Sequence, residues 1–143
     1  MTPIPTADFN AQVIEEFRAN KGRVGGRFEG MPLLLLHHTG ARTGQRRVNP
    51  VAYLGDGGRY VLIASKGGAP TNPAWYHNLK ASPHTKIEIG ADTLDVVARE
   101  ATGEERERLF HTAAERVSPQ FAEYEEKTPR TIPVIVLTPA ETR

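Results

Sequence analysis

The residues of this chain best suited to chemistry are cations on two short glycine-rich segments. The segment 40–47 carries Arg42, Arg46 and Arg47, and Lys66 stands between small residues further along the chain. Arginine binds phosphate and carboxylate groups through paired hydrogen bonds, and glycine lets a ligand approach backbone N–H groups. The two segments therefore favour binding of a polyanion. Exposed turns with solvated cations are the alternative interpretation.

A third candidate part is the aromatic segment 72–79, Asn-Pro-Ala-Trp-Tyr-His-Asn-Leu. Asn72 as N-cap, with Pro73 at the first helical position, predicts the start of a helix. A tryptophan at the position of Trp75 on such a helix is more often a core residue than part of a ligand-binding wall. Asn78 lies on the adjoining face, where a solvated side chain is the simplest interpretation. Together with the cations, the helix is typical of a site for a charged, ring-bearing cofactor.

Other kinds of active site lack their parts. The chain has no cysteine, which excludes disulfides, thiolate metal sites and thiol nucleophiles. It has no Gly-x-Ser-x-Gly, Gly-x-Gly-x-x-Gly or phosphate-loop motif. Metal-ligand spacing such as His-Glu-x-x-His is also missing, so we expect no metal site. A net charge of +1 gives no argument for nucleic acid. Such a chain does chemistry best through a bound redox cofactor.

The remaining pattern predicts an α+β fold of six mostly hairpin-connected strands, closed into a small barrel with helices to one side. Strands are expected at 33–38, 47–54, 59–65, 86–89, 93–100 and 132–138, and helices from Thr6 or Asp8, from Asn72, and from Thr102 with capping-box spacing. The turn 56–58 would pair the second strand with the third and bring Lys66 close to the arginines. One of His37 and His38 must point inward, as a hydrogen-bonded core residue.

Two units are expected along the 143 residues: an N-terminal helix with a flexible basic segment at 1–27, and the barrel at 28–143. The longest apolar run, 33–36, is far too short to span a membrane. No secretory signal opens the chain, so we expect a cytoplasmic protein.

The runs 33–50, 64–68 and 72–79 resemble the deazaflavin (F420)-dependent nitroreductase family, and the similarity extends from about residue 28 to 137. This resemblance implies a split β-barrel that binds coenzyme F420, a deazaflavin with a phosphodiester and an oligoglutamate tail. It places Arg42 and Arg47 on the tail, Lys66 near the phosphate, and gives Arg46 only general electrostatic help. The implied cofactor-binding residues are Arg42, Thr43, Gly44, Arg47, Val48, Asn49, Pro50, Ala64, Ser65, Lys66, Pro73, Ala74, Trp75 and Asn78.

The resemblance also implies hydride transfer from C5 of the reduced deazaflavin to a quinone or nitro acceptor. Ser65 would stabilise negative charge on the acceptor, and Tyr124 or water would supply the proton. The implied substrate-binding residues are Phe17, Ala52, Phe121 and Tyr124. Ala52 and Lys127 stand where some members have larger aromatic residues, which argues against bulky nitroimidazole substrates.

Alternatives remain at this point. A protein of this fold also suits a non-catalytic carrier of the deazaflavin or of a fatty acid, or binding of FMN, whose single phosphate needs fewer cations. The sequence leaves open a peripheral contact with the membrane, and the choice between monomer and homodimer.

Overall fold

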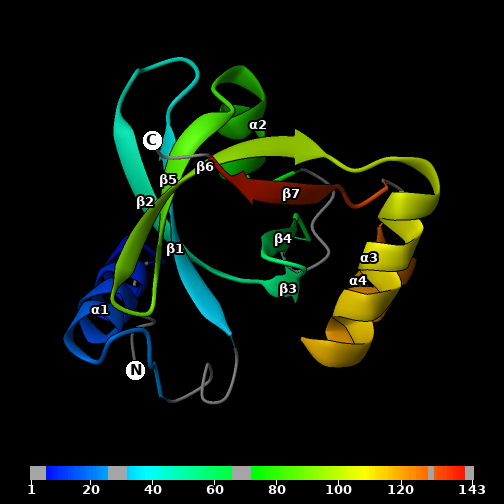
Figure 1. The fold of residues 1–143 in the computed structure, drawn as a ribbon, viewed down its shortest axis with the longest axis horizontal. Coiled ribbons are helices and arrows are strands. Elements are labelled where there is room, and N and C mark those ends of the chain that lie inside the picture. Colours follow the sequence, from blue (N-terminus) through cyan, green and yellow to red (C-terminus); the bar gives the residue numbers. More distant parts are fainter. Residues whose placement is uncertain (1–5, 26–31, 66–71, 129–130, 141–143) are drawn as a thin grey trace.

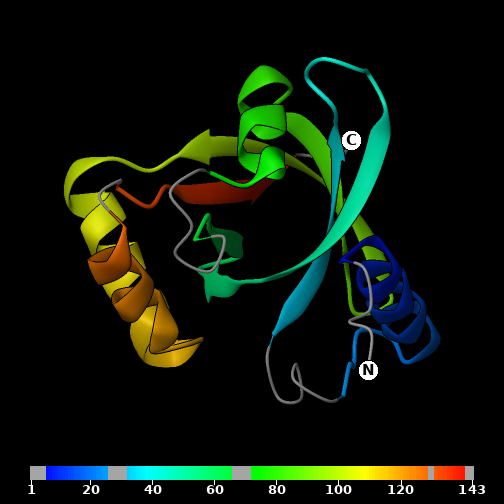
Figure 2. The same ribbon diagram turned by 180° about the vertical axis from the view of Figure 1, so that it is seen from behind.

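The computed structural model describes residues 6–25, 32–65, 72–128 and 131–140. Within them, seven antiparallel strands form one curled sheet in the order β2-β1-β5-β6-β7-β4-β3, flanked by helices (Figures 1 and 2). In chain order the elements are α1 (Thr6–Ala19), β1 (Leu33–Thr39), β2 (Arg46–Ala52), β3 (Leu54–Asp56), β4 (Arg59–Ile63), α2 (Ala74–Ala81), β5 (His84–Ile89), β6 (Asp92–Glu100), α3 (Gly103–Arg116), α4 (Gln120–Lys127) and β7 (Val134–Pro139). The predicted α+β split-barrel class is confirmed. None of the described helices is long and apolar enough to cross a membrane.

The strand expected at 47–54 is in fact two strands, so the predicted count of six was wrong. β2 pairs with β1, whereas β3 pairs with β4. The break falls at Tyr53, whose N–H donates to the Pro32 carbonyl at 3.1 Å. The predicted pairing of the whole strand with 59–65 was therefore also wrong, and Lys66 lies outside the described residues. β2 is an edge strand, where Pro50 is tolerated because it has no N–H to donate.

The inner face of the curled sheet packs around α2. Trp75, Tyr76 and Leu79 of α2 share a buried cluster with residues from β1, β4, β5, β6 and β7. Strands β1 and β4 are not neighbours in the sheet, so their common cluster identifies this as the concave side. Both faces of β1 are covered, which explains its unbroken apolar run at 33–36.

Helix α1 covers the outer face of β1 and β2. Phe17 is 1 % exposed and packs on Leu33 and Leu35. Next to it, Arg18 donates to both carboxylate oxygens of Glu88 on β5, at 3.0 and 2.7 Å. The expected boundary between residues 27 and 28 falls outside the described residues and stays a prediction.

Helices α3 and α4 cover the outer face of β3, β4 and β7 at the other side of the molecule (Figure 1). Thr102 is the N-cap residue of α3, but its side chain makes no capping hydrogen bond. The predicted capping box is therefore wrong. Glu105 instead accepts hydrogen bonds from Arg99 of β6 at 2.6 and 2.9 Å. Helix α4, Gln120–Lys127, was not predicted.

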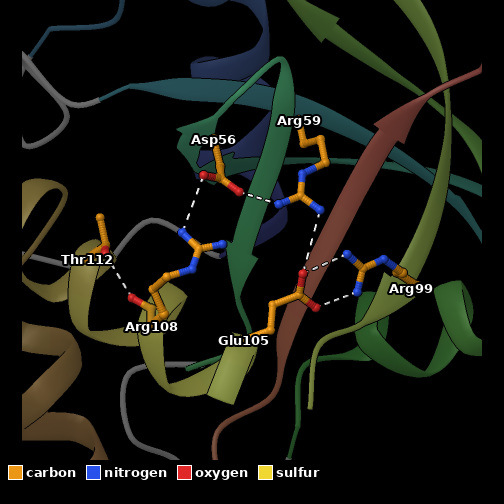
Figure 3. A network of polar contacts seen from close by, with 6 residues as sticks. All are labelled: Asp56, Arg59, Arg99, Glu105, Arg108 and Thr112. Carbon is orange, nitrogen blue, oxygen red and sulfur yellow. Dashed lines mark hydrogen bonds and ion pairs between the residues drawn. The ribbon is translucent and has the colours of Figure 1, made fainter. Parts of the chain in front are cut away.

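A network of ion pairs connects α3 to β3, β4 and β6 (Figure 3). Asp56, at the end of β3, pairs with Arg59 and lies 3.5 Å from Arg108 of α3. Glu105 reaches Arg59 as well, at 3.6 Å. The Thr112 hydroxyl donates to the Arg108 carbonyl within the helix. These contacts tie the start of α3 to the β3–β4 hairpin and to β6.

Candidate functional site

The hairpin between β1 and β2 is a tight turn held by its own hydrogen bonds. Gly40 N–H donates to the Gln45 carbonyl at 2.8 Å, and Gly44 N–H donates to the Gly40 carbonyl at 2.9 Å. The Thr43 hydroxyl accepts from Gln45 N–H at 3.2 Å. Gly44 has a φ of +70°, which a residue with a Cβ rarely adopts. The closed turn leaves Arg42 exposed at its tip. We call residues 40–47 the arginine turn.

The three guanidinium groups of the arginine turn have no carboxylate partner among the described residues. Arg42, Arg46 and Arg47 are all exposed, and Arg47 makes only a weak contact of 3.4 Å with the Gln45 side chain. By contrast, five arginines elsewhere in the described chain form ion pairs with carboxylates: Arg18, Arg59, Arg99, Arg106 and Arg108. The donors of this turn are therefore available to an external anion.

A cavity of about 180 Å³ lies at the same end of the β1–β2 ladder. It is lined by His37, His38, Thr39, Arg46, Arg47, Thr85 and Lys86. Arg46 and Arg47 are adjacent in β2 and so point to opposite faces, but both reach this cavity at the strand end. Lys86 comes from β5. Sequence reasoning missed it, because nothing in the sequence shows that β5 lies beside β1.

A buried network joins the arginine turn to α2. Asn78 Nδ2 donates to His38 Nδ1 at 2.9 Å, and His38 Nε2 lies 2.6 Å from Asn49 Oδ1. Ala41 N–H donates to Asn78 Oδ1 at 2.9 Å. Because Nδ1 of His38 accepts, its proton is on Nε2 and is donated to Asn49. We call these four residues the His38 network.

The His38 network sets the position of the arginine turn relative to α2. His38 is 4 % exposed and Asn78 is 7 % exposed. The prediction that one histidine of the pair is a hydrogen-bonded core residue is confirmed, and the residue is His38. The interpretation of Asn78 as a solvated side chain is wrong. Figures 1 and 2 show the loop between β1 and β2 beside α2.

Burial lowers the pKa of His38, and the positive charges of Arg47 and His37 act in the same direction. The hydrogen bond to Asn49 opposes them in part. A proton on Nδ1 would also face the Asn78 amide group that now donates to that atom. The imidazole is therefore neutral in the folded protein near neutral pH.

This lowered pKa predicts a loss of stability in mild acid. An unfolded histidine takes up a proton near its ordinary pKa of about 6.5, whereas folded His38 resists it. The unfolded state then binds more protons, so the free energy of unfolding falls as the pH drops below about 6.5 and levels off below the folded pKa. Urea unfolding between pH 8 and 5 measures this. The His38→Gln variant should have a flatter profile in that range, and parallel profiles would contradict the assignment.

The other residues expected to bind the cofactor lie in different parts of the structure. Trp75 is 9 % exposed and Ala64 is fully buried, both in the inner core cluster. Ser65 is 8 % exposed and follows the end of β4. Val48, by contrast, packs beneath α1 on the outer face. Pro73 is buried and stands as N-cap of α2, one position from its expected place, while Ala74 is exposed.

The residues expected around the acceptor lie in two separate places. Phe17 and Ala52 belong to the cluster under α1, and Phe121 and Tyr124 pack half-buried on the cluster under α3. These two helices stand at opposite sides of the molecule (Figure 2). The Tyr124 hydroxyl donates to the Gln120 side chain at 3.0 Å. The structure does not bring the two pairs together, and their common role stays a prediction.

Comparison with known proteins identifies the chain's family. The profile of the family described as F420H(2)-dependent quinone reductase matches residues 10–139. The chain belongs to this family. An F420H(2)-dependent quinone reductase of Mycobacterium tuberculosis is 42 % identical over 125 residues, covering 85 % of this chain and 84 % of that protein.

Two solved structures agree with this membership. One, described as an F420-H2 dependent reductase (FDR-A), is 43 % identical with a TM-score of 0.68, covering 74 % of this chain and 93 % of its own. The other, described as a domain-swapped dimer, is 37 % identical with a TM-score of 0.70, covering 94 % and 99 %.

Membership in the F420H(2)-dependent quinone reductase family confirms the predicted family, oxidoreductase class and F420 cofactor. The donor set fits this cofactor, because arginines that have no carboxylate partner among the described residues, on a hydrogen-bonded turn, suit a chain of carboxylates. The family also favours a reductase over the carrier and FMN alternatives. Which residues touch the cofactor stays a prediction.

Proposed function

We propose that this chain holds reduced F420 with its acidic tail on the arginine turn, and that a quinone is the acceptor. When bound, the deazaflavin supplies a hydride from C5. The observation that carries the proposal is a set of three guanidinium groups, without a carboxylate partner in the described part of the chain, on a turn bonded to α2 through the His38 network. Arg42 and Arg47 bind the tail carboxylates, while Arg46 and Lys86 raise the positive potential at the cavity beside them.

The chain's own groups supply orientation and charge stabilisation. The His38 network sets the distance between the tail-binding arginines and α2, and so the placement of a bound ring. Ser65, two residues after β4, donates a hydrogen bond to the acceptor oxygen as negative charge grows there. Tyr124 holds a proton within α4 that can pass to the reduced acceptor.

The proposal is tested by following reoxidation of reduced F420 by menadione with the purified protein. We expect acceleration that saturates in both cofactor and quinone. Ser65→Ala should lower kcat by about 100-fold, the low end of the range for losing one such donor, and should lower kcat more than it lowers F420 affinity. Trp75 fluorescence, quenched by a ring bound nearby, measures that affinity. No acceleration with menadione or with any nitroarene would contradict the proposal.

A further inference from the structure

Helix α4 is packed more lightly than α2 or α3. None of its residues is fully buried. Phe121 and Tyr124 are half-buried on the cluster under α3, whereas α3 itself buries Leu109, Phe110 and Ala113. Light packing of this kind does not by itself fix how a short helix is rotated or how far it is displaced along its neighbour.

One buried arginine forms hydrogen bonds that connect α4 to the rest of the protein. Arg106 on α3 is 6 % exposed, and its Nη2 donates to Glu125 of α4 at 3.0 Å and to the Ile132 carbonyl at 2.8 Å. Its Nη1 donates to Glu107 at 2.9 Å. The guanidinium carbon lies 4.4 Å from the centroid of the Phe110 ring. A single side chain therefore joins α3, α4 and the segment that leads into β7.

Stability alone gives a weak reason for this arrangement. Burying a guanidinium costs several kcal/mol of hydration, and an apolar side chain of similar size often serves a core as well or better. Here the carboxylates of Glu107 and Glu125 remain substantially exposed, which weakens their attraction for the buried cation. Arg106 Nε has no hydrogen-bond partner within the described residues. What the arginine does supply is a directional link to α4, which hydrophobic packing cannot give.

The Arg106–Glu125 hydrogen bond lies next to the residues of α4 that are expected to bind the acceptor. Glu125 follows Tyr124 directly and lies one helical turn after Phe121, so holding the Glu125 carboxylate sets the rotation of both aromatic side chains. We propose that Arg106 is a positioning residue that holds α4 so that Phe121 and Tyr124 form one wall of the quinone site. This inference rests on the proposed function.

The test combines kinetics with hydrogen exchange. Glu125→Ala removes the Arg106–Glu125 hydrogen bond at its more exposed end, where the substitution should not affect folding. Arg106→Met removes it at the buried end. Both should raise KM for menadione by about 10-fold or more, as expected when a substrate wall is displaced, with F420 affinity within about twofold of wild type. Glu125→Gln keeps an acceptor oxygen for Arg106 and should restore KM. Glu126→Ala, the neighbouring exposed carboxylate, is the matched control and should change nothing.

Hydrogen exchange separates this inference from the proposed function. Glu125→Ala should speed amide exchange across 120–127 and leave 109–116 unchanged. Unchanged exchange in α4 would overturn the link, whatever the activity. An unchanged KM, or an equal loss of F420 affinity, would overturn the positioning role. If the wild-type protein reduces no quinone, the proposed function fails and this role falls with it, while the exchange result still decides whether the link exists.

Discussion

Reversing the charge of Arg42 and Arg47 together should lower the affinity for F420 by at least about 100-fold. A hydrogen bond to a charged group contributes about 1.5 kcal/mol or more, and two such losses amount to about 3 kcal/mol, or more than 100-fold in Kd. The new glutamates would also repel the tail. Because neither arginine has a carboxylate partner among the described residues, the double variant Arg42→Glu/Arg47→Glu should fold as well as wild type. Quenching of Trp75 fluorescence by F420 gives the affinity.

The matched control for this prediction is Arg116→Glu. Arg116 is an exposed residue in the last turn of α3, away from the arginine turn, and its reversal should leave F420 affinity unchanged. Wild-type affinity should also weaken as salt concentration rises, while the double variant should respond little, since surface charges are screened at about 10 Å in 0.1 M salt. Equal binding by wild type and double variant would exclude the arginine turn as the tail site.

The arginine turn was predictable because its structure is local. Gly40 and Gly44 mark a tight turn in the sequence, and the turn is closed by bonds among residues 40–45. The alternation of β1 likewise showed that one histidine of the pair 37–38 must face inward. Sequence patterns report such neighbours directly, because the interacting groups are a few residues apart.

Features that depend on distant partners were not predictable. The strand after the turn changes partner beyond Tyr53, whose N–H still bonds to Pro32 beside β1 whereas Leu54 pairs with β4, and no residue type indicates that change. Lys86 joins the basic cavity only through the pairing of β5 with β1. The role of Asn78 as a connector requires His38 to lie beside α2. Glu105 has capping-box spacing, but its carboxylate binds Arg99 instead.

The second large effect is expected from removing the centre of the His38 network. His38→Leu leaves the buried Nδ2 of Asn78 and the Oδ1 of Asn49 without the histidine, and each unsatisfied group costs about 1–3 kcal/mol. The free energy of unfolding should therefore fall by about 2–4 kcal/mol. F420 affinity should fall as well, because the arginine turn loses its fixed position relative to α2. Urea unfolding and fluorescence titration measure the two effects.

The neighbouring histidine provides the control. His37 faces the other side of β1, where its Nε2 contacts Glu88 at 2.8 Å and its side chain is one-third exposed, so His37→Leu should cost less than about 1 kcal/mol. The double variant His38→Leu/Asn78→Leu should lose less than the sum of its single variants, since removing both partners leaves fewer buried groups unpaired. Strict additivity, or equal losses for the two histidines, would mean that the turn is held by its own local bonds. The arginines would then be positioned independently of α2. The His38 network would not set the distance between the bound tail and the ring.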